Sequence, residues 1–450
     1  MTDTLTSFMA ALDQRTSQIL KSCTSCGKCV EVCPMTAPAG VHISETDGKS
    51  KAVAGGVLNI IQTGNGPEES GRWANACSGS GHCIDACEYG VNPRFMLGLA
   101  RAALRRGQDA TLDTARDGSA QGFRILGSSV RVLSQLQLSP DQLQRLGQIR
   151  GGVQPENPDI IFYTGCNVLK TPHIVLLCLD ILDALGVSYQ VMGGPAYCCG
   201  VIQFRTGDLE GFERMSGRTI DKLAQANKSE VLSWCPSCQV HLGEAALQTT
   251  SVDGENPFDL NAFVVYLASK LDALKPLMTR RVEKRVGLHE HPGIGGITEA
   301  AQSLLEAIPG LEFVELEQPR VGYMCNVINS LPDYKRDYHA EQLAAAEAAN
   351  LDVLAGIYHV CHRELCSHER DWPFEVVNFM ELVGESMGIE HPDLFKRLKL
   401  MQDVDAIIAD SADMIAQYDM DLDEVRTVVL RDMLGEQPLE LGRGAQGRGI

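Results

Sequence analysis

Cysteines that could bind a metal or take part in redox chemistry are concentrated between Gly165 and Cys238. This stretch contains Cys166, the adjacent pair Cys198–Cys199 followed by Gly200, and Cys235-Pro236-Ser237-Cys238. A zinc ion or a cubane iron–sulfur cluster takes four thiolates, so five cysteines indicate an unusual cluster or one additional redox thiol. Glycine after the pair fits a tight turn that brings both sulfurs to one site. The alternative is a zinc-binding C-x2-C pair with three incidental cysteines.

Two further cysteine runs lie near the N-terminus. The first, Cys23-x2-Cys26-x2-Cys29-x3-Cys33-Pro34, has the spacing of bacterial ferredoxins, in which the fourth cysteine ligates the other cluster. The second run has serine in place of its second cysteine. The crossed pattern assigns one [4Fe–4S] cluster to Cys23, Cys26, Cys29 and Cys87, and a second cluster to Cys77, Cys83 and Cys33, beside Ser80. Three thiolates favour [3Fe–4S] for the second cluster; the alternative is a second [4Fe–4S] cluster completed by Ser80 or water.

A partial repeat follows the cysteine-rich stretch at an offset of 126 residues, which maps Cys199 to Cys325 and Cys235 to Cys361. The copy lacks the other three cysteines of the first half but has Cys366 nearby. Histidines accompany it at His289, His291, His359, His362 and His368. We predict a metal site from Cys325, Cys361, Cys366 and His291, holding zinc or a further iron–sulfur cluster. A repeat that has lost its metal is the alternative.

These motifs resemble two known protein families. The five-cysteine stretch from Gly165 to Cys238, the first half of the repeat, resembles the cysteine-rich CCG domain of the B subunit of heterodisulfide reductase. This domain is also found in the iron–sulfur subunits of glycolate oxidase and anaerobic glycerol-3-phosphate dehydrogenase. The resemblance implies a non-cubane [4Fe–4S] cluster on Cys166, Cys198, Cys199, Cys235 and Cys238. The N-terminal runs are similar to the ferredoxin-type C subunit of heterodisulfide reductase, a mostly helical dicluster module. The chain therefore resembles a fusion of these two subunits.

Composition excludes several other functions. A net charge of −19 over 450 residues argues against binding to nucleic acids or anionic membranes, both of which require a basic surface. Residues 1–11 have no features of an export signal, and no apolar stretch is long enough to span a bilayer. We therefore expect a cytoplasmic protein whose membrane contact, if any, is through a partner. Sixteen cysteines are then expected to bind metal and not to form disulfides.

Periodicity predicts an α+β multidomain chain. We expect a ferredoxin-type dicluster domain over 1–110, a linker over 111–156, an intact CCG repeat over 157–275 and a degenerate repeat over 276–390. Residues 391–450 are expected to form C-terminal helices, one of them over 393–417, and a disordered tail from Gly435 onwards. Strands are predicted at Ile160–Tyr163, Ser188–Met192 and Val231–Trp234. Cys166, Cys198 and Cys235 each follow one of them, at the strand ends where α/β folds build their sites.

The predicted sites move single electrons, and no motif for flavin, nicotinamide or haem accompanies them. We therefore expect an iron–sulfur electron-transfer subunit of a hetero-oligomeric, flavin-linked oxidoreductase. Its flavin would lie on a partner flavoprotein, and its acceptor would be a quinone or a membrane subunit. Two alternatives are a catalytic subunit of a disulfide reductase and a redox sensor or cluster carrier.

Overall fold

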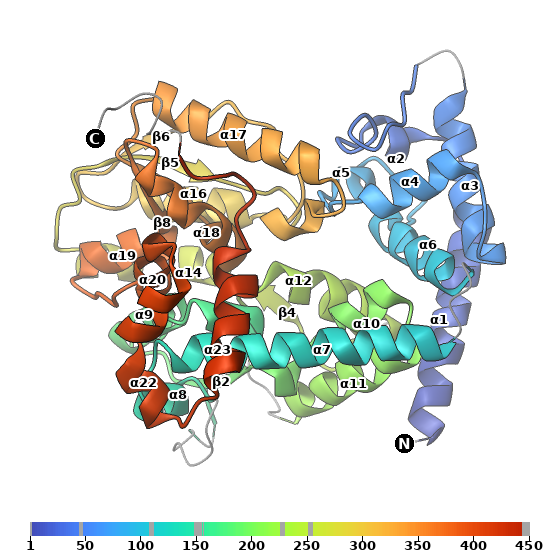
Figure 1. Cartoon of the computed structure of the whole chain (residues 1–450). Helices are drawn as coiled ribbons and strands as arrows, with labels where there is room; N and C mark the ends of the chain where they lie inside the picture. Colours follow the sequence, from blue (N-terminus) through green and yellow to red (C-terminus); the bar gives the residue numbers. More distant parts are fainter. Residues whose placement is uncertain are drawn as a thin grey trace.

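The computed structural model describes residues 2–44, 48–107, 112–147, 155, 157–225, 230–250 and 255–442. Two small parallel sheets with many surrounding helices form a mixed helical and α/β architecture (Figure 1). This confirms the predicted α+β class. None of the described helices has both the length and the apolar character that a membrane span requires.

The N-terminal part is helical and lies on one side of the molecule, drawn in blue in Figure 1. Its helices are α1 (Thr2–Ser22), α2 (Lys28–Glu31), α3 (Lys49–Thr63), α4 (Glu68–Ala76), α5 (His82–Asp85) and α6 (Pro93–Gly107). The short helices α2 and α5 lie within the two cysteine runs and begin after the same backbone turn, because Gly27 (φ 86°) and Gly81 (φ 87°), which precede them, are both left-handed. Only glycine adopts this conformation without steric cost. The two runs are thus local copies of each other, with Ser80 at the position of Cys26.

The first sheet is built by the region with the intact cysteine set. Its strands are β1 (Ile160–Gly165), β2 (Tyr189–Gly193), β3 (Glu230–Ser233) and β4 (Leu260–Ala262), paired in parallel in the order β2-β1-β3-β4. The connecting helices include α9 (His173–Ala184), α10 (Val201–Thr206), α11 (Leu209–Ala224), α12 (Pro236–Cys238), a π-helical segment (Gln239–Leu247), α13 (Gln248–Thr250), α14 (Phe263–Ser269) and α15 (Leu271–Leu274). All six residues of β1 are buried, as expected for a central parallel strand.

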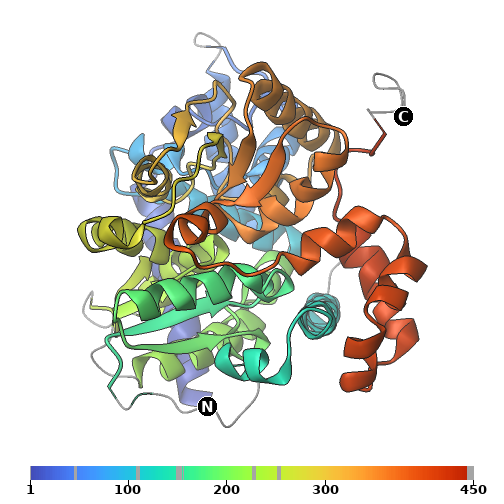
Figure 2. The ribbon, with the colours of Figure 1, turned by 90° about the vertical axis from the view of Figure 1, so that its left-hand side faces the viewer.

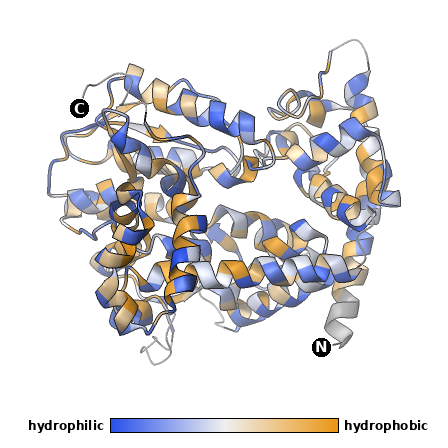
Figure 3. Ribbon diagram, viewed as in Figure 1, coloured by the Kyte–Doolittle hydropathy of each residue, from blue (hydrophilic) through white to orange (hydrophobic). Residues whose placement is uncertain are grey.

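The second sheet repeats this topology. It contains β5 (Arg285–His289), β6 (Glu312–Val314), β7 (Val353–Gly356) and β8 (Glu375–Asn378), in the equivalent order β6-β5-β7-β8. Its helices are α16 (Ile297–Glu306), α17 (Pro332–Ala348), α18 (His359–Leu365) and α19 (Phe379–Met387). The halves pack reciprocally, α9 against α19 and α14 against α16. In Figure 3, α17 is hydrophilic toward its N-terminal end and less so toward its alanine-rich C-terminal end. The repeat predicted from cysteine spacing is thus also a repeat of strand order.

The segment predicted to be a linker contains two helices. α7 (Leu112–Gln135) is long and runs across the front of the first sheet region in the view of Figure 1, and α8 (Pro140–Arg145) follows it. α7 contacts α10 and the C-terminal helix α23 (Leu422–Val428). Its C-terminal half buries Val130, Val132 and Leu133. Packing of this apolar face explains why a glycine- and serine-rich sequence is helical here.

The C-terminal region also differs in detail from the prediction. A continuous helix was expected over 393–417, but the chain forms α20 (Leu394–Met401), α21 (Val404–Asp410) and α22 (Ala412–Gln417). The first break lies at Gln402, which is left-handed (φ 53°), and the Asp403 side chain then caps α21. α23 and a π-helical turn (Val429–Leu434) follow these helices, beside the second sheet region (Figure 2).

The tail was predicted to be disordered from Gly435 onwards. Within its described part, Glu436 forms ion pairs with Arg363 (2.7 Å) and Lys170 (3.4 Å), both of which are buried. Residues 443–450 lie outside the described part of the chain. The start of the tail therefore packs against both halves of the molecule.

Candidate metal centres and the cavity between them

The five cysteines of the first half converge at the carboxyl ends of β1, β2 and β3. All five side chains are buried, with exposures between 1% and 9%. Their thiols form a continuous chain of contacts, in the order Cys166, Cys198, Cys199, Cys238, Cys235. Hydrogen bonds between neighbours lower the pKa of Cys198 and Cys235 and raise the pKa of Cys166, Cys199 and Cys238. Such a buried group of thiols fits a metal centre, because the thiolate is the ligand form and a metal stabilises it.

Two glycines create the space for these thiols. Gly165 has φ 74°, and a Cβ at this position would lie 3.0 Å from Cys235 Cβ and 3.2 Å from Cys238 Sγ. Gly200 has φ 78°, and a Cβ there would lie 2.6 Å from a ring carbon of Phe212. Any larger residue would therefore be strained in its backbone and would press on the cysteine group or on the core behind it.

The first N-terminal cysteine group lines a single cavity. Cys23, Cys26, Cys29 and Cys87 all face it, so the second run contributes one cysteine to the first run's group. Burial raises the pKa of Cys29 to about 12, and the neighbouring Cys23, Cys26 and Cys87 act in the same direction. The structure therefore brings together the four residues that the crossed spacing assigned to one cluster.

The second group is crossed in the same way. Cys33 lies with Cys77, Ser80 and Cys83 around another cavity. The Ser80 hydroxyl is already engaged, because it accepts a hydrogen bond from the Gly322 backbone N–H (3.0 Å) and shares one with the Ser78 hydroxyl (3.0 Å). The bond from Gly322 holds the Ser80 side chain to the degenerate repeat, an interaction that the sequence did not predict.

The predicted site in the degenerate repeat has a different membership. His291, Cys325 and Cys361 lie together, and the fourth member is His289. The structure separates Cys366 from this group, because its side chain packs in a hydrophobic cluster that includes Phe395 and Leu398 of the C-terminal helices. The paired signal His289-x-His291 was available in the sequence, since residues two apart in an extended strand share one face.

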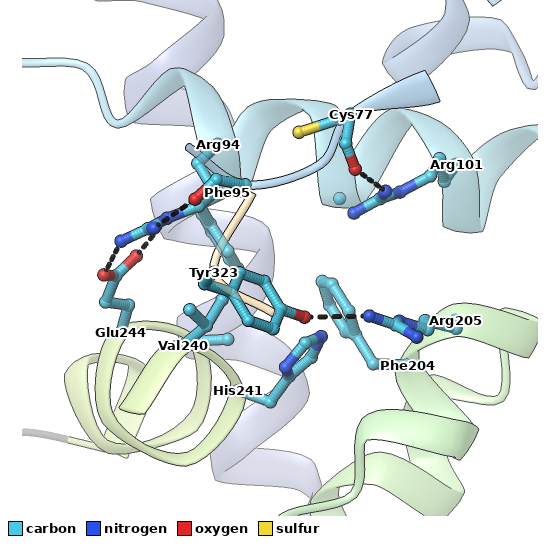
Figure 4. A pocket seen from close by; sticks show the side chains of 13 residues that line it. Cys77, Arg94, Phe95, Arg101, Phe204, Arg205, Val240, His241, Glu244 and Tyr323 are labelled. Carbon is cyan, nitrogen blue, oxygen red and sulfur yellow. Dashed lines mark hydrogen bonds and ion pairs between the residues drawn. The ribbon is translucent and has the colours of Figure 1, made fainter. Parts of the chain in front are cut away.

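A further cavity lies where the helical module meets both sheet regions (Figure 4). Cys77, Arg94 and Arg101 line it from the helical module, Arg205 and His241 from the first sheet region, and Tyr323 from the second. None of these residues except Cys77 stands out in the sequence, because only the tertiary structure brings them together.

Positive charge dominates this cavity. The Arg94 guanidinium is paired with Glu244. In the part of the chain that the structure describes, Arg101 and Arg205 form no ion pair; they donate instead to the Cys77 carbonyl (3.1 Å) and the Tyr323 hydroxyl (2.8 Å). Burial and these arginines hold the pKa of His241 well below its usual value, so its ring is neutral.

His241 connects the cavity to the five-cysteine group. Its Nδ1 lies 3.0 Å from the Ser237 carbonyl oxygen, which accepts the ring N–H. Ser237 lies between Cys235 and Cys238. The cavity therefore has Cys77 on one side and, on the other, a histidine bonded to the loop that carries two cysteines of the first sheet region.

Comparison with known proteins identifies related sequences over most of the chain. Residues 160–243 match the family model of the CCG cysteine-rich domain. The chain is 24% identical over 407 residues to the D subunit of dihydromethanophenazine:CoB–CoM heterodisulfide reductase from Methanosarcina mazei, covering 82% of this chain and 95% of the relative. It is 25% identical over 395 residues to the B subunit of fumarate reductase (CoM/CoB) from Methanothermobacter marburgensis, covering 82% and 73%.

Proposed function

We propose that this chain is a CCG-domain iron–sulfur protein of heterodisulfide reductase type that relays single electrons within a multi-subunit, flavin-linked oxidoreductase. Cys23, Cys26, Cys29 and Cys87 would hold a [4Fe–4S] cluster, and Cys33, Cys77 and Cys83 a [3Fe–4S] cluster. Cys166, Cys198, Cys199, Cys235 and Cys238 would hold a non-cubane [4Fe–4S] cluster. Cysteine-bound clusters supply one-electron transfer over a wide range of reduction potentials.

The cavity of Figure 4 carries this proposal. It joins Cys77 to His241, and His241 is hydrogen-bonded to the loop between Cys235 and Cys238. Arg101 and Arg205 add positive charge beside Cys77, which favours the more negative, reduced state of a group bound there. Phe95 and Phe204 stack with ring centroids 6.2 Å apart and close the cavity with apolar surface. The side chains around this cavity thus connect two of the cysteine groups of the chain.

A partner must connect this chain to two-electron chemistry. The two relatives described above are each named as one subunit of a reductase, which supports a hetero-oligomer. We propose a flavoprotein as the partner that splits electron pairs, and a quinone or a membrane subunit as the second acceptor. Purification of the tagged chain from its native host, followed by flavin analysis of the co-purifying protein, tests this partner.

The similarity to a heterodisulfide reductase favours one competing function, direct reduction of a disulfide. Anaerobic reduction of the full chain, followed by mixing with either a quinone analogue or a small disulfide, separates the two. We expect oxidation by the quinone analogue, no thiol release from the disulfide, and loss of quinone reactivity in Cys198→Ala. Cys178→Ala is the matched control, because Cys178 is buried in α9 outside all the cysteine groups. Stoichiometric thiol release that depends on Cys198 would overturn the relay in favour of a disulfide reductase.

A further inference from the structure

Four side chains of metal-ligating type meet at one point in the degenerate repeat. His289 and His291 come from the end of β5, Cys325 from the loop after β6, and Cys361 from α18. One ligand atom from each residue lies within 4.8 Å of all the others, and none of the four side chains is more than 1% exposed. These elements correspond to those that carry the five cysteines of the first half, so the position is a remodelled copy of that site.

The histidine rings are oriented as metal ligands. The His291 Nδ1 lies 2.6 Å from the Val321 carbonyl oxygen, which can only accept, so Nδ1 carries the proton. The His289 Nδ1 lies 2.8 Å from the Gln342 side-chain oxygen and donates to it in the same way. Both Nε2 atoms therefore present lone pairs toward the thiols. Histidines that bind metals are usually held by such a hydrogen bond from the second ring nitrogen.

The distances fit one ion and not a cluster. His289 Nε2 lies 3.1 Å from Cys325 Sγ, and His291 Nε2 lies 3.2 Å from Cys361 Sγ and 3.6 Å from Cys325 Sγ. Tetrahedral zinc with bonds of about 2.0–2.1 Å to nitrogen and about 2.3 Å to sulfur places these ligands about 3.5 Å apart. A [2Fe–2S] cluster with two histidines on one iron and two cysteines on the other would separate nitrogen from sulfur much further.

We propose that His289, His291, Cys325 and Cys361 bind a single Zn²⁺ ion in a closed, tetrahedral site. A tetrahedral set of two nitrogens and two sulfurs is typical of zinc, and four protein ligands leave no open position for a substrate. Zinc has no redox chemistry, so this site carries no electrons. The ion stabilises the degenerate repeat instead.

The site also supports the wall of the second N-terminal cysteine group. His291 donates to the Val321 carbonyl, and the next residue, Gly322, donates its N–H to the Ser80 hydroxyl. Tyr323 then enters the cavity of Figure 4 and bonds Arg205. The ion would therefore fix the loop over 321–323 against the segment that carries Cys77 and Cys83.

Metal analysis of the full chain tests the site. We expect one zinc per chain, with an X-ray absorption spectrum that shows two sulfur and two nitrogen neighbours. His289→Gln and Cys361→Ser should each remove that equivalent of zinc. Two matched controls should retain it: Cys366→Ser, whose side chain lies elsewhere, and His339→Gln. His339 lies with Cys325 and Glu364 in an overlapping group, but Lys335 already pairs with Glu364 at 2.7 Å.

A second measurement does not depend on variants that fold poorly. Unmodified protein produced with Co²⁺ should show the intense visible absorption of a tetrahedral cobalt–thiolate site. Zinc that is absent, zinc retained in His289→Gln, or zinc lost equally in Cys366→Ser would each overturn the proposal. Iron at these four ligands, or a disulfide between Cys325 and Cys361 in the purified protein, would also overturn it.

Discussion

Replacing Ser80 with cysteine tests how the second N-terminal group binds iron. Ser80 stands at the position of Cys26 in the local repeat and lines the cavity of Cys33, Cys77 and Cys83. A thiol at this position supplies the fourth ligand of a cubane cluster. We expect Ser80→Cys to raise the iron content by one atom per chain. The EPR signal of an oxidised [3Fe–4S] cluster should disappear, and a second [4Fe–4S] signal should appear on reduction.

The stability cost of the change follows from the two hydrogen bonds of Ser80. The Gly322 N–H is buried and loses its acceptor when the hydroxyl is removed. An unsatisfied buried donor costs about 1–3 kcal/mol. The control Ser80→Ala should therefore lower the free energy of unfolding by about 1–3 kcal/mol. Ser80→Cys should lose less, since sulfur is a weak acceptor and the new ligand bond offsets part of the loss. Denaturant unfolding under anaerobic conditions measures both.

The Ser80→Ala variant shows whether the Ser80 oxygen is a ligand of the cluster. If the hydroxyl only bonds Ser78 and Gly322, Ser80→Ala keeps the iron content and the three-iron signal of the unmodified protein. A cubane signal in the unmodified protein that becomes a three-iron signal in Ser80→Ala would refute the reasoning, because the serine oxygen would then be a cluster ligand.

Two further predictions concern charge. Arg101→Gln should lower the reduction potential of the group at Cys77 in a redox titration, because the Arg101 guanidinium donates to the Cys77 carbonyl (3.1 Å) and its charge favours the reduced state. A unit charge acting over roughly 10 Å at an effective dielectric constant of about 20 contributes about 1.7 kcal/mol, on the order of 70 mV for one electron. Arg105→Gln, exposed on the same helix, should leave the potential unchanged. His173→Gln should destabilise the fold in a pH-dependent way. Burial lowers the pKa of His173, and the positive charge of Lys396 acts in the same direction. The carboxylates of Asp393 (3.5 Å) and Glu381 (3.6 Å) outweigh both effects, so the pKa of His173 is raised above 6.5. Burial raises the pKa of Glu381, and His173 outweighs it, so that pKa falls below 4.5. The unfolding free energy lost in the variant should be largest between about pH 4.5 and 6.5 and should shrink as the pH rises through the folded pKa of His173; a pH-independent loss would contradict the ion pairs.

The sequence predicted the first sheet region well because local signals and tertiary structure agree there. Each predicted strand is present within one or two residues, and the cysteines follow β1, β2 and β3 as the pattern requires. The crossed grouping of the N-terminal cysteines could also be predicted, because ligand spacing directly encodes which run supplies which residue. Metal-ligand chemistry requires a fixed spacing of cysteines along the chain, and this spacing can be recognised in the sequence without knowledge of the packing.

Helix α7 and the position of Cys366 could not be predicted, because both depend on tertiary contacts that leave no pattern in the neighbouring sequence. Gly118, Gly122 and Gly127 lower the intrinsic helix propensity of α7, and the helix forms because its other face packs. Cys366 looked like a ligand because it lies near Cys361 in the sequence. It follows the end of α18, however, and its side chain turns toward the C-terminal helices, so His289, at the end of β5, takes the fourth position.

The contrast between the two repeats bears directly on the choice between relay and disulfide reduction. Cleavage of a disulfide into two thiols requires two electrons, and the intact repeat offers one five-thiol site for one-electron chemistry. The corresponding position in the second repeat has two histidines and two cysteines at distances that suit a single metal ion in a closed site. Under our proposals, both electrons would have to pass successively through one centre, with a sulfur radical held between the two transfers. A relay to a quinone requires no sulfur radical, because a quinone accepts electrons one at a time and holds the first as a semiquinone. The loss of the second thiol set therefore favours one-electron transfer to a separate acceptor, and the thiol-release experiment with Cys198→Ala tests this step directly.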